Sequence, residues 1–198
     1  MPMRVADLNR CPHCTAPVNP DMERCPYCDE KIYMTSFNDL SSFSVPQVQK
    51  CRQAYQQCLV SDPANPTLNL SVGLCYLKLK LFDEAYSYFS KAMDGNFDDS
   101  EPYFYAAISL IKGKKAFLHT RPEIDRMIEL VDAANSIEER GIYHYFLAYL
   151  KYDYFKRKFL NTTPNYKDYL ARAQRAGCSA MDMAQIFEMM GVEKIAIV

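Results

Sequence analysis

The sequence predicts a mainly α-helical chain with a small cysteine-rich unit at its N-terminal end. First, four of the eight cysteines fall between residues 11 and 28. Second, helix start and stop signals recur from Ser44 to Gly191, with no convincing strand pattern after residue 34. Third, 49% of the 198 residues are hydrophobic, enough for a sizeable core. We expect a cysteine-rich unit, a linker, a helical domain and an apolar C-terminal tail at 1–34, 35–45, 46–191 and 192–198.

The cysteine-rich unit contains two Cys-Pro-x-Cys motifs separated by ten residues. Two residues between paired cysteines let the chain turn tightly, so that both sulfur atoms point at one position. Four thiolates from two such motifs form a closed tetrahedral shell around Zn²⁺ at about 2.3 Å. A unit this small cannot fold on apolar burial alone, so zinc would supply free energy for its folding. The predicted ligands of this structural zinc are Cys11, Cys14, Cys25 and Cys28.

Three other roles are open to these cysteines. Cys25-Pro26-Tyr27-Cys28 alone has the form of a glutaredoxin-like redox motif, but the strand, helix and parallel sheet that this motif needs are not predicted around it. Two disulfides would need an oxidising compartment, and the N-terminus has no secretory signal. Iron can also bind four thiolates, although the short spacer favours zinc. Over residues 9–33 the paired motifs resemble the knuckles of a small zinc ribbon, which implies a fold but no activity.

The residues around the motifs add smaller expectations. The spacer 15–24 is rich in turn formers and would make a short hairpin, and 31–34 would be the last strand of the unit. His13 is expected to face solvent, because four cysteines leave no need for a fifth ligand. In the linker, Phe37, Leu40 and Phe43 are able to anchor the chain to a neighbouring element.

Helix boundaries after residue 44 follow capping residues. Ser, Thr or Asn before a proline or an acidic residue starts a helix, and glycine ends one. About eight helices in short-looped pairs are predicted, starting at Ser44, Asn65, near Phe82, Ser100, Thr120, Ser136 with Glu139, Thr163 with Pro164, and Ser179 with Asp182. Predicted ends lie before Pro63 and at Gly95, Gly177 and Gly191.

A sequence repeat connects two of the helical pairs. Two sets of four residues align at a spacing of 34 residues. The first set is Cys51, Tyr55, Cys58 and Pro63, and the second is Ala85, Phe89, Ala92 and Phe97. Gly73 and Tyr76 precede the second set. This spacing resembles the tetratricopeptide repeat (TPR), with its pattern W-x2-L-G-x2-Y…A-x3-F…P at a period of about 34. The resemblance covers residues 46–99 and implies antiparallel helical pairs stacked into an α-solenoid.

The match to the TPR pattern has gaps. Asn69 stands at the large aromatic position, and Phe97 stands at the proline position. Helices after residue 100 match weakly. If the next second-helix set is Met127, Val131 and Ala134, the repeat contains an insertion, for which residues 112–122 are the candidate.

In a TPR-like stack, the first helix of each pair lines an inner face. TPR proteins that bind the acidic tails of heat-shock chaperones carry Asn and Lys there, whereas this chain has Leu70 and Leu74, so that mode is not expected. An apolar groove would accept an amphipathic helix of a partner protein, unless the chain's own C-terminal helices fill it. The predicted partner-binding residues are Leu70, Leu74, Leu77, Lys78, Phe104, Ile108 and Lys112.

The segment 141–160 is aromatic on nearly every face, which predicts a buried helix. Its Lys151 and Asp153 exclude a membrane span. Between 141 and 178, seven basic residues accompany two acidic ones, whereas between 61 and 101 seven acidic residues accompany three lysines. Such polarity can orient a partner or dock RNA, although most charged runs are only solvated surfaces.

No catalytic constellation is visible. The three histidines, His13, His119 and His144, lack a nucleophile or ligand set, and no phosphate-binding glycine loop is present. His119 is expected in solvent, and His144 packed or at a helix surface. Neither a secretory signal nor an apolar run of about 20 residues is found, which favours a cytoplasmic location without a membrane span.

Together these patterns predict a non-enzymatic cytoplasmic adaptor. Its TPR-like surface would bind a protein partner, the zinc ribbon would be a second contact module, and no small-molecule substrate is expected. The alternative is a protein that binds RNA or DNA through the ribbon and the basic helices 141–178, although acidic residues outnumber basic ones in 1–33. A third possibility is a redox protein that uses Cys25 and Cys28.

Overall fold

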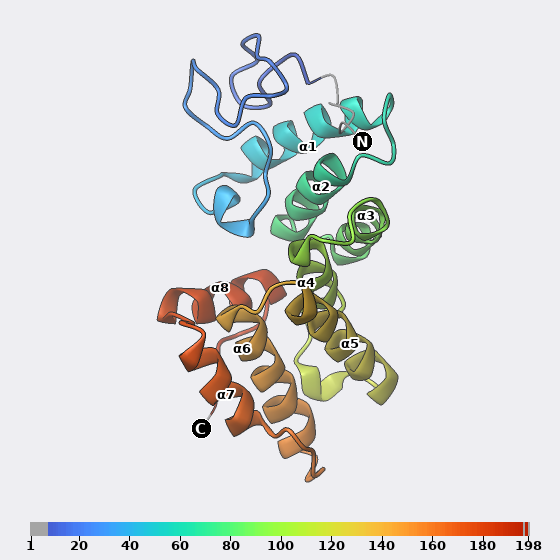
Figure 1. Cartoon of the computed structure of the whole chain (residues 1–198), viewed down its shortest axis with the longest axis vertical. Helices are drawn as coiled ribbons and strands as arrows, with labels where there is room; N and C mark the ends of the chain where they lie inside the picture. The colour runs from blue at the N-terminus through green and yellow to red at the C-terminus, as the bar shows by residue number, and fades with distance from the viewer. Residues whose placement is uncertain (1–7, 196, 198) are drawn as a thin grey trace. The chain divides into compact units, whose positions relative to one another are not determined.

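A computed structural model of the chain describes residues 8–195 and 197 (Figure 1). The chain forms two compact units, Met1–Phe97 and Asp98–Val198. Over the described residues, the secondary structure comprises eight α-helices, short 3-10 and π-helical turns, and isolated β-bridges in place of strands. Within each unit, most consecutive helices pack on each other. The predicted class, a mainly α fold of TPR-like helical pairs, is confirmed.

The first unit places the cysteine motifs before three helices. They are followed by η1 (Phe37–Leu40), α1 (Val45–Leu59), α2 (Pro66–Lys78) and α3 (Phe82–Gly95). The predicted N-caps of α1 and α2 are confirmed. The Gln47 side chain accepts the Ser44 N–H at 2.9 Å, and the Asn65 side chain accepts the Leu68 N–H at 3.0 Å. The short connection 79–81 sends α3 back along α2.

The TPR-like pair α2–α3 shows why its pattern uses one small and one large residue. Gly73 on α2 lies so close to Phe89 on α3 that a Cβ atom at Gly73 would be 2.5 Å from the Phe89 ring. Phe89 and its flanking Ala85 and Ala92 are fully buried. The glycine therefore leaves the hole that the aromatic ring fills, as the repeat predicts.

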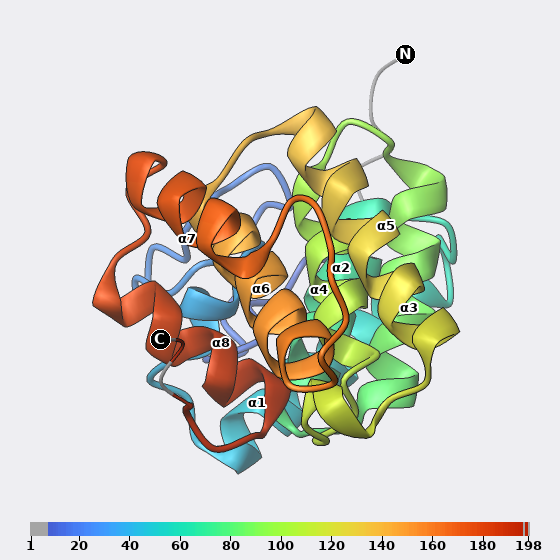
Figure 2. The same ribbon diagram turned by 90° about the horizontal axis from the view of Figure 1, so that it is seen from below.

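The second unit has helices before and after a π-helical turn. Its elements are α4 (Ser100–Ser109), η2 (Ala116–Leu118), α5 (Arg121–Ile137), α6 (Gly141–Leu150), the π-helical η3 (Lys151–Lys156), α7 (Tyr166–Arg175) and α8 (Ala180–Met190). Figure 2 shows α6 between α5 on one side and α7 and α8 on the other, and all three contact it. The residues of α6 are buried on almost every face, which confirms the prediction for this segment.

α4 begins at Ser100, as predicted, with Asp99 as its N-cap, whose carboxylate accepts the Glu101 N–H. Two other predicted helix starts are corrected by the structure. Ser136 lies inside α5, where its hydroxyl donates to a carbonyl of the preceding turn, so it starts no helix. α7 begins after Asn165, whose side chain accepts the N–H groups of the next turn, rather than at Thr163. In each case a competing capping group or a longer helix decided the boundary.

The predicted partner-binding residues do not form an open groove. Five of them are buried, namely Leu70, Leu74, Leu77, Phe104 and Ile108. On α2, the Ser71 hydroxyl donates to the Met34 carbonyl at 2.8 Å, and the Lys78 ammonium lies 5.2 Å from the centre of the Phe37 ring. Residues 34–40 therefore lie along this helix and cover part of it.

The equivalent face of α4 is filled from within the second unit. The Phe104 ring lies 4.6 Å from that of Tyr143 and 6.1 Å from that of Phe146, both on α6. The expectation of an apolar groove is thus corrected here in favour of its alternative, filling by the chain's own later helices. Lys112, by contrast, is exposed after the end of α4.

The helical domain is flanked by the segments 35–45 and 192–198. Phe37, Leu40 and Phe43 are buried, so the segment 35–45 is anchored to the first unit. The C-terminal tail 192–198 falls partly outside the described residues. Within the described part of the chain, no helix has the length and apolar character needed to cross a bilayer.

Candidate metal centre

The two cysteine motifs fold into turns of the same form, which we call the first knuckle (residues 9–18) and the second knuckle (residues 23–32). In each, the N–H of the first cysteine donates across the turn, and the residue after the second cysteine donates its N–H back to the carbonyl of the first cysteine. These bonds measure 2.9–3.0 Å and join Cys11 to Ala16 and Thr15, and Cys25 to Glu30 and Asp29. The second knuckle repeats the first 14 residues later.

Each knuckle requires one residue in a left-handed backbone conformation. Thr15 has φ of 66° and Asp29 has φ of 58°, each directly after the second cysteine of its motif. This conformation costs a non-glycine residue about 1–2 kcal/mol, and aspartate tolerates it better than a β-branched threonine. The turn is therefore under local strain that its cross-turn hydrogen bonds and the converging sulfurs offset.

The four sulfur atoms converge on one point. All four Sγ atoms lie within 4.8 Å of one another. The Cys11–Cys28 and Cys14–Cys25 sulfur pairs are 3.7 and 3.6 Å apart. Four sulfurs about 2.3 Å from a central ion are about 3.8 Å from each other in a tetrahedron. A disulfide would need about 2.05 Å, so the arrangement fits a tetrahedral metal ion and not two disulfides.

The protein environment acts differently on the thiols. Burial raises the pKa of Cys11, although hydrogen bonds from backbone N–H groups act to lower it. Burial also raises the pKa of Cys28, to about 12. At Cys25 burial also raises the pKa, but hydrogen bonds from the N–H groups of Tyr27 and Cys28, together with those of the Cys14 and Cys11 side chains, outweigh it and bring the pKa to about 7. Backbone donors aimed at a sulfur are suited to a thiolate ligand.

The first knuckle is packed onto α1. The His13 ring lies 4.7 Å from the Phe43 ring in an edge-to-face contact, and 3.8 Å separates its Nε2 from the Cys51 Sγ. The Lys50 ammonium donates to the His13 carbonyl. The expectation that His13 faces solvent is therefore wrong, because α1 lies against this side of the knuckle (Figure 1). Burial raises the pKa of Cys51 to about 12, in keeping with its predicted packing role.

The second knuckle is fixed to the same helices. The buried Tyr55 hydroxyl on α1 donates to the Ile32 carbonyl at 2.8 Å, and Ile32 and Met34 are themselves fully buried. These contacts, with that of Ser71 on α2, make the cysteine unit part of the same core as the first helices. Sequence reasoning missed this attachment, since Tyr55 and Ser71 carry no signal for their distant partners.

The unit has less β-structure than predicted. Only single bridges, Arg10 with Pro17 and Arg24 with Lys31, are formed in its described residues, one in each knuckle. The spacer 15–24 does not form a hairpin of its own, because the hairpin-like bonds close each knuckle around its cysteines. The segment 31–34 is likewise not a strand, because Ile32 and Met34 pack against α1 and α2.

The other two histidines lie in the second unit and take structural roles. His119 is buried, in contrast to the prediction, and its Nε2 lies 3.0 Å from the Ile111 carbonyl. Its Nδ1 lies 3.4 Å from the Glu123 carboxylate, so it fastens the loop before α5. His144 is packed, as predicted, with its Nε2 2.8 Å from the Glu139 carboxylate.

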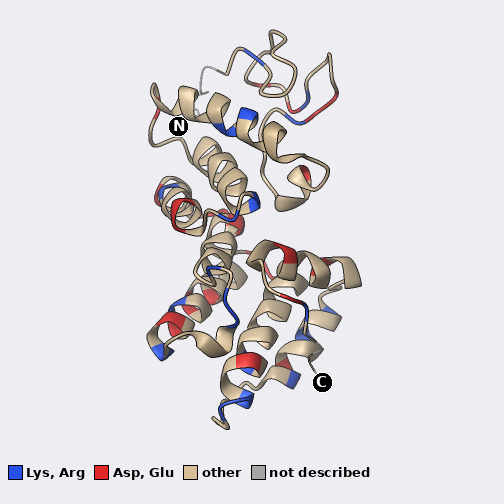
Figure 3. Cartoon of the chain, turned by 180° about the vertical axis from the view of Figure 1, so that it is seen from behind, with Lys and Arg blue, Asp and Glu red and all other residues tan. Residues whose placement is uncertain are grey.

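The basic residues between 141 and 178 do not gather into one exposed surface. Several lie over aromatic rings, at 3.8–5.2 Å from the ring centre: Lys151 over Phe155, Arg157 over Phe117, Lys158 over Tyr154 and Arg172 over Tyr169. Figure 3 shows acidic and basic segments interspersed along the helices of this unit. The structure thus offers no support for the predicted nucleic-acid alternative.

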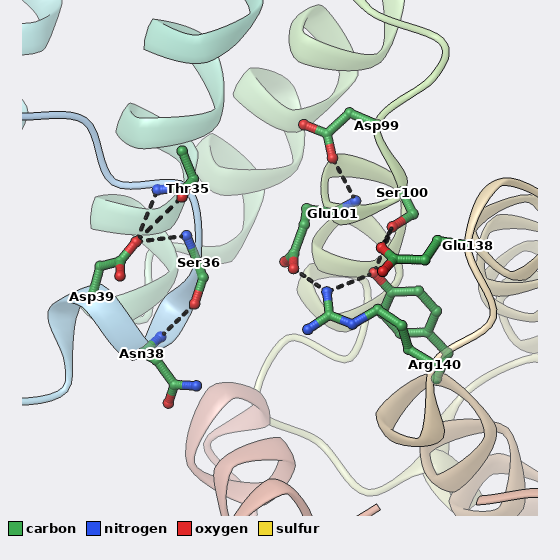
Figure 4. Close-up of polar contacts among 10 residues, drawn as sticks. Thr35, Ser36, Asn38, Asp39, Asp99, Ser100, Glu101, Glu138 and Arg140 are labelled. Atoms are coloured by element: carbon green, nitrogen blue, oxygen red, sulfur yellow. Dashed lines mark hydrogen bonds and ion pairs between the residues drawn. The ribbon is translucent and has the colours of Figure 1, made fainter. Parts of the chain in front are cut away.

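Two polar clusters were not predicted from the sequence (Figure 4). In the first unit, the Asp39 carboxylate accepts the N–H groups of Thr35 and Ser36 at 3.1 and 3.0 Å and pairs with Lys31 at 3.0 Å, which fixes the exit from the second knuckle. The only sequence signal for this cluster is the capping-box spacing of Ser36 and Asp39.

The second cluster joins α4 to the start of α6. The Ser100 and Tyr143 hydroxyls are 2.8 Å apart, Ser100 donates to Glu138 at 3.2 Å, and Arg140 pairs with Glu101. Burial raises the pKa of Glu101, against the opposing effects of Tyr105 and Arg140. No local sequence pattern reveals this cluster, since its two halves come from helices that are far apart in the chain.

Comparisons with known proteins give little guidance to function. No family model matches the chain, and no curated protein matches it. Among solved structures, MamA MSR-1 C2 is similar, with 14% identity and a TM-score of 0.48 over 68% of this chain and 78% of that one.

Proposed function

We propose that this protein is a non-enzymatic adaptor that contacts other proteins through its TPR-like helices and a zinc-stabilised knuckle unit. The observation that carries the proposal is the convergence of four cysteine sulfurs directly against the first helices of a helical-pair fold. A four-thiolate shell leaves no open coordination position, which is typical of structural and not catalytic zinc. A reducing compartment such as the cytoplasm would keep these thiols available.

Zinc is the metal favoured by this donor set. Four thiolates suit both zinc and iron, but zinc accepts a fixed tetrahedral shell without redox chemistry. The chain purified from cells without added metal should contain one zinc per molecule by elemental analysis. A red protein with one iron per molecule and reversible reduction would instead identify an electron-transfer site, the remaining redox possibility.

The zinc unit would also supply a contact surface. The two knuckles place corresponding residues in different surroundings, since His13 packs on α1 whereas Tyr27 is 68% exposed. Met22, between the knuckles, is 42% exposed. An exposed aromatic side chain on a knuckle, beside an adaptable methionine, is suited to protein contacts, since aromatic residues and methionine are enriched at interfaces.

Point variants test this proposal better than a truncation, because removal of the knuckles would expose buried residues such as Tyr55. The zinc-loaded chain, tagged and returned to its own cells, is compared with a Met22→Ser/Tyr27→Ser variant by quantitative affinity capture. Val60→Ser is the matched control, since Val60 is 82% exposed elsewhere in the first unit. A partner that is lost only with the double variant supports the contact role. Identical captured proteins for all three chains would contradict it.

A further inference from the structure

The second unit contains a pocket of about 420 Å³ between η3, the following loop and the start of α7. Lys151, Lys156 and Lys167 line it, together with Thr162 and Thr163. We call it the lysine pocket. None of the residues that line it is acidic.

The π-helical turn explains why two of these lysines share the pocket. Lys151 and Lys156 are five residues apart, which would set them about 140° apart around an α-helix with 3.6 residues per turn. The wider winding of a π-helix, with its i to i+5 bonds, brings the fifth residue back toward the same side. The backbone irregularity thus gathers positive charge that a regular helix would spread.

Lys151 is a buried cation. It is 8% exposed, and its ammonium donates to the Thr162 hydroxyl at 2.9 Å and lies 4.6 Å from the centre of the Phe155 ring. The Arg121 guanidinium lies 4.9 Å from the centre of the same ring, so a second cation is close by. Among the described residues, no carboxylate is within ion-pair distance of Lys151.

The electrostatic surroundings of Lys151 are accordingly unfavourable to its charge. Burial and then Arg121 lower the pKa of Lys151, and the carboxylates of Asp132 and Asp125 oppose this lowering only in part. A bound anion in direct contact with the ammonium would reverse it, because an opposite charge nearby favours the protonated amine.

The remaining charges favour an anion with more than one negative charge. Lys156 and Lys167 are exposed at the pocket, so three lysines face one space. The nearest acidic side chain along the chain, Asp168, accepts the Asn165 N–H at 2.8 Å as part of the α7 cap. Lysines act as separate point charges that can approach different oxygens, whereas a single carboxylate is best matched by the fork of an arginine.

We propose that the lysine pocket binds a phosphate monoester. At neutral pH this group carries nearly two negative charges and three acceptor oxygens, which match three ammonium groups and the threonine hydroxyls. The phosphate can belong to a small metabolite or to a phosphorylated side chain of a peptide. This binding is independent of the zinc unit and of the adaptor role.

The test uses the zinc-loaded full chain and inorganic phosphate as the probe. Amide chemical-shift changes at constant ionic strength should map to residues 151–167 and saturate below about 10 mM phosphate. The Lys156→Gln/Lys167→Gln variant removes two charged donors with exposed side chains and should weaken binding about tenfold or more. Lys114→Gln, which removes an exposed lysine outside the pocket, is the matched control and should leave the affinity unchanged.

Three outcomes would overturn the proposal. They are the absence of saturable shifts at residues 151–167, equal weakening by Lys114→Gln, and acetate binding as tight as that of phosphate. A phosphoserine peptide and its unphosphorylated form separate the two sources. Tighter binding of the phosphopeptide than of free phosphate assigns a peptide ligand, and equal binding assigns a small phosphorylated molecule.

Discussion

The two units of this protein stabilise their helices by different means. In the first, a glycine faces a phenylalanine across α2 and α3, and the four-cysteine centre covers the start of the helical stack. In the second, the aromatic helix α6 occupies the centre, the buried Asp153 binds the Phe117 N–H, and the half-buried Glu101 pairs with Arg140. The comparison shows that one helical-pair architecture tolerates two solutions for the core. Four perturbations, in order of expected effect, test it.

Loss of the metal should have the largest effect and should act on the first unit alone. Zinc contributes on the order of 10 kcal/mol to folding in small zinc domains. Cys11→Ser, or chelation of the wild-type metal, should therefore remove hydrogen-exchange protection from α1 while protection of α6 persists. Cys178 is a half-buried cysteine outside the four-cysteine centre, so Cys178→Ser should leave the hydrogen-exchange protection of α1 and of α6 unchanged. Full protection of α1 in metal-free protein would mean that the knuckles are not part of the core.

The close contact between Gly73 and Phe89 should be the next most important for the stability of the first unit. Gly73→Val should destabilise this unit by about 3 kcal/mol in urea unfolding, because the fully buried Phe89 ring cannot move away. Gly73→Ala should lose about 1–2 kcal/mol despite its higher helix propensity. Adding Phe89→Leu to Gly73→Ala should recover part of that loss. A stabilising Gly73→Ala would refute the close packing.

The second unit should depend more on a buried ion pair than on an exposed one of the same type. Asp153 is 0% exposed and accepts the Phe117 N–H at 2.9 Å and an Arg157 N–H at 2.5 Å. Asp153→Ala should cost about 3 kcal/mol, since it leaves these donors without an acceptor. Asp125→Ala removes the exposed partner of Arg121 and should cost less than about 1 kcal/mol. Equal losses would place Asp153 in a solvated environment.

The smallest expected effect is a pH dependence of the second unit. Burial raises the pKa of Glu101 above its ordinary value of 4.5, so the folded state holds this proton more tightly than the unfolded state. Its contribution to stability is complete below that ordinary pKa and is lost as the pH rises through the folded pKa. Glu101→Gln should flatten the pH profile of hydrogen exchange in α4. An unchanged slope would exclude Glu101 as its source.

Sequence patterns predicted those features that are set by residues close together in the chain. The caps at Ser44, Asn65 and Ser179 act within one helical turn, and the cysteine motifs turn within four residues, so both could be read directly. The contact of Gly73 with Phe89 was also predictable, because the repeat pattern records a packing rule for adjacent helices.

Patterns failed where burial depends on a distant segment. His13 and His119 were expected in solvent, but Cys51 and Ile111, from other elements, lie against them. The leucines of α2 suggested a groove because the sequence does not show that residues 34–40 cover part of that helix. A polar or apolar residue has the same local pattern whether solvent, a partner or its own chain faces it.

The amino-acid sequence alone therefore determined the helical class, the positions of most helix ends and the four cysteines that converge, since each arises from interactions over a few residues. Only the tertiary structure decided that the knuckles join the core of the first helices and that three lysines meet at one pocket. Those outcomes depend on contacts between segments far apart in the chain, whose formation is set by the summed packing of the whole unit and not by any local pattern.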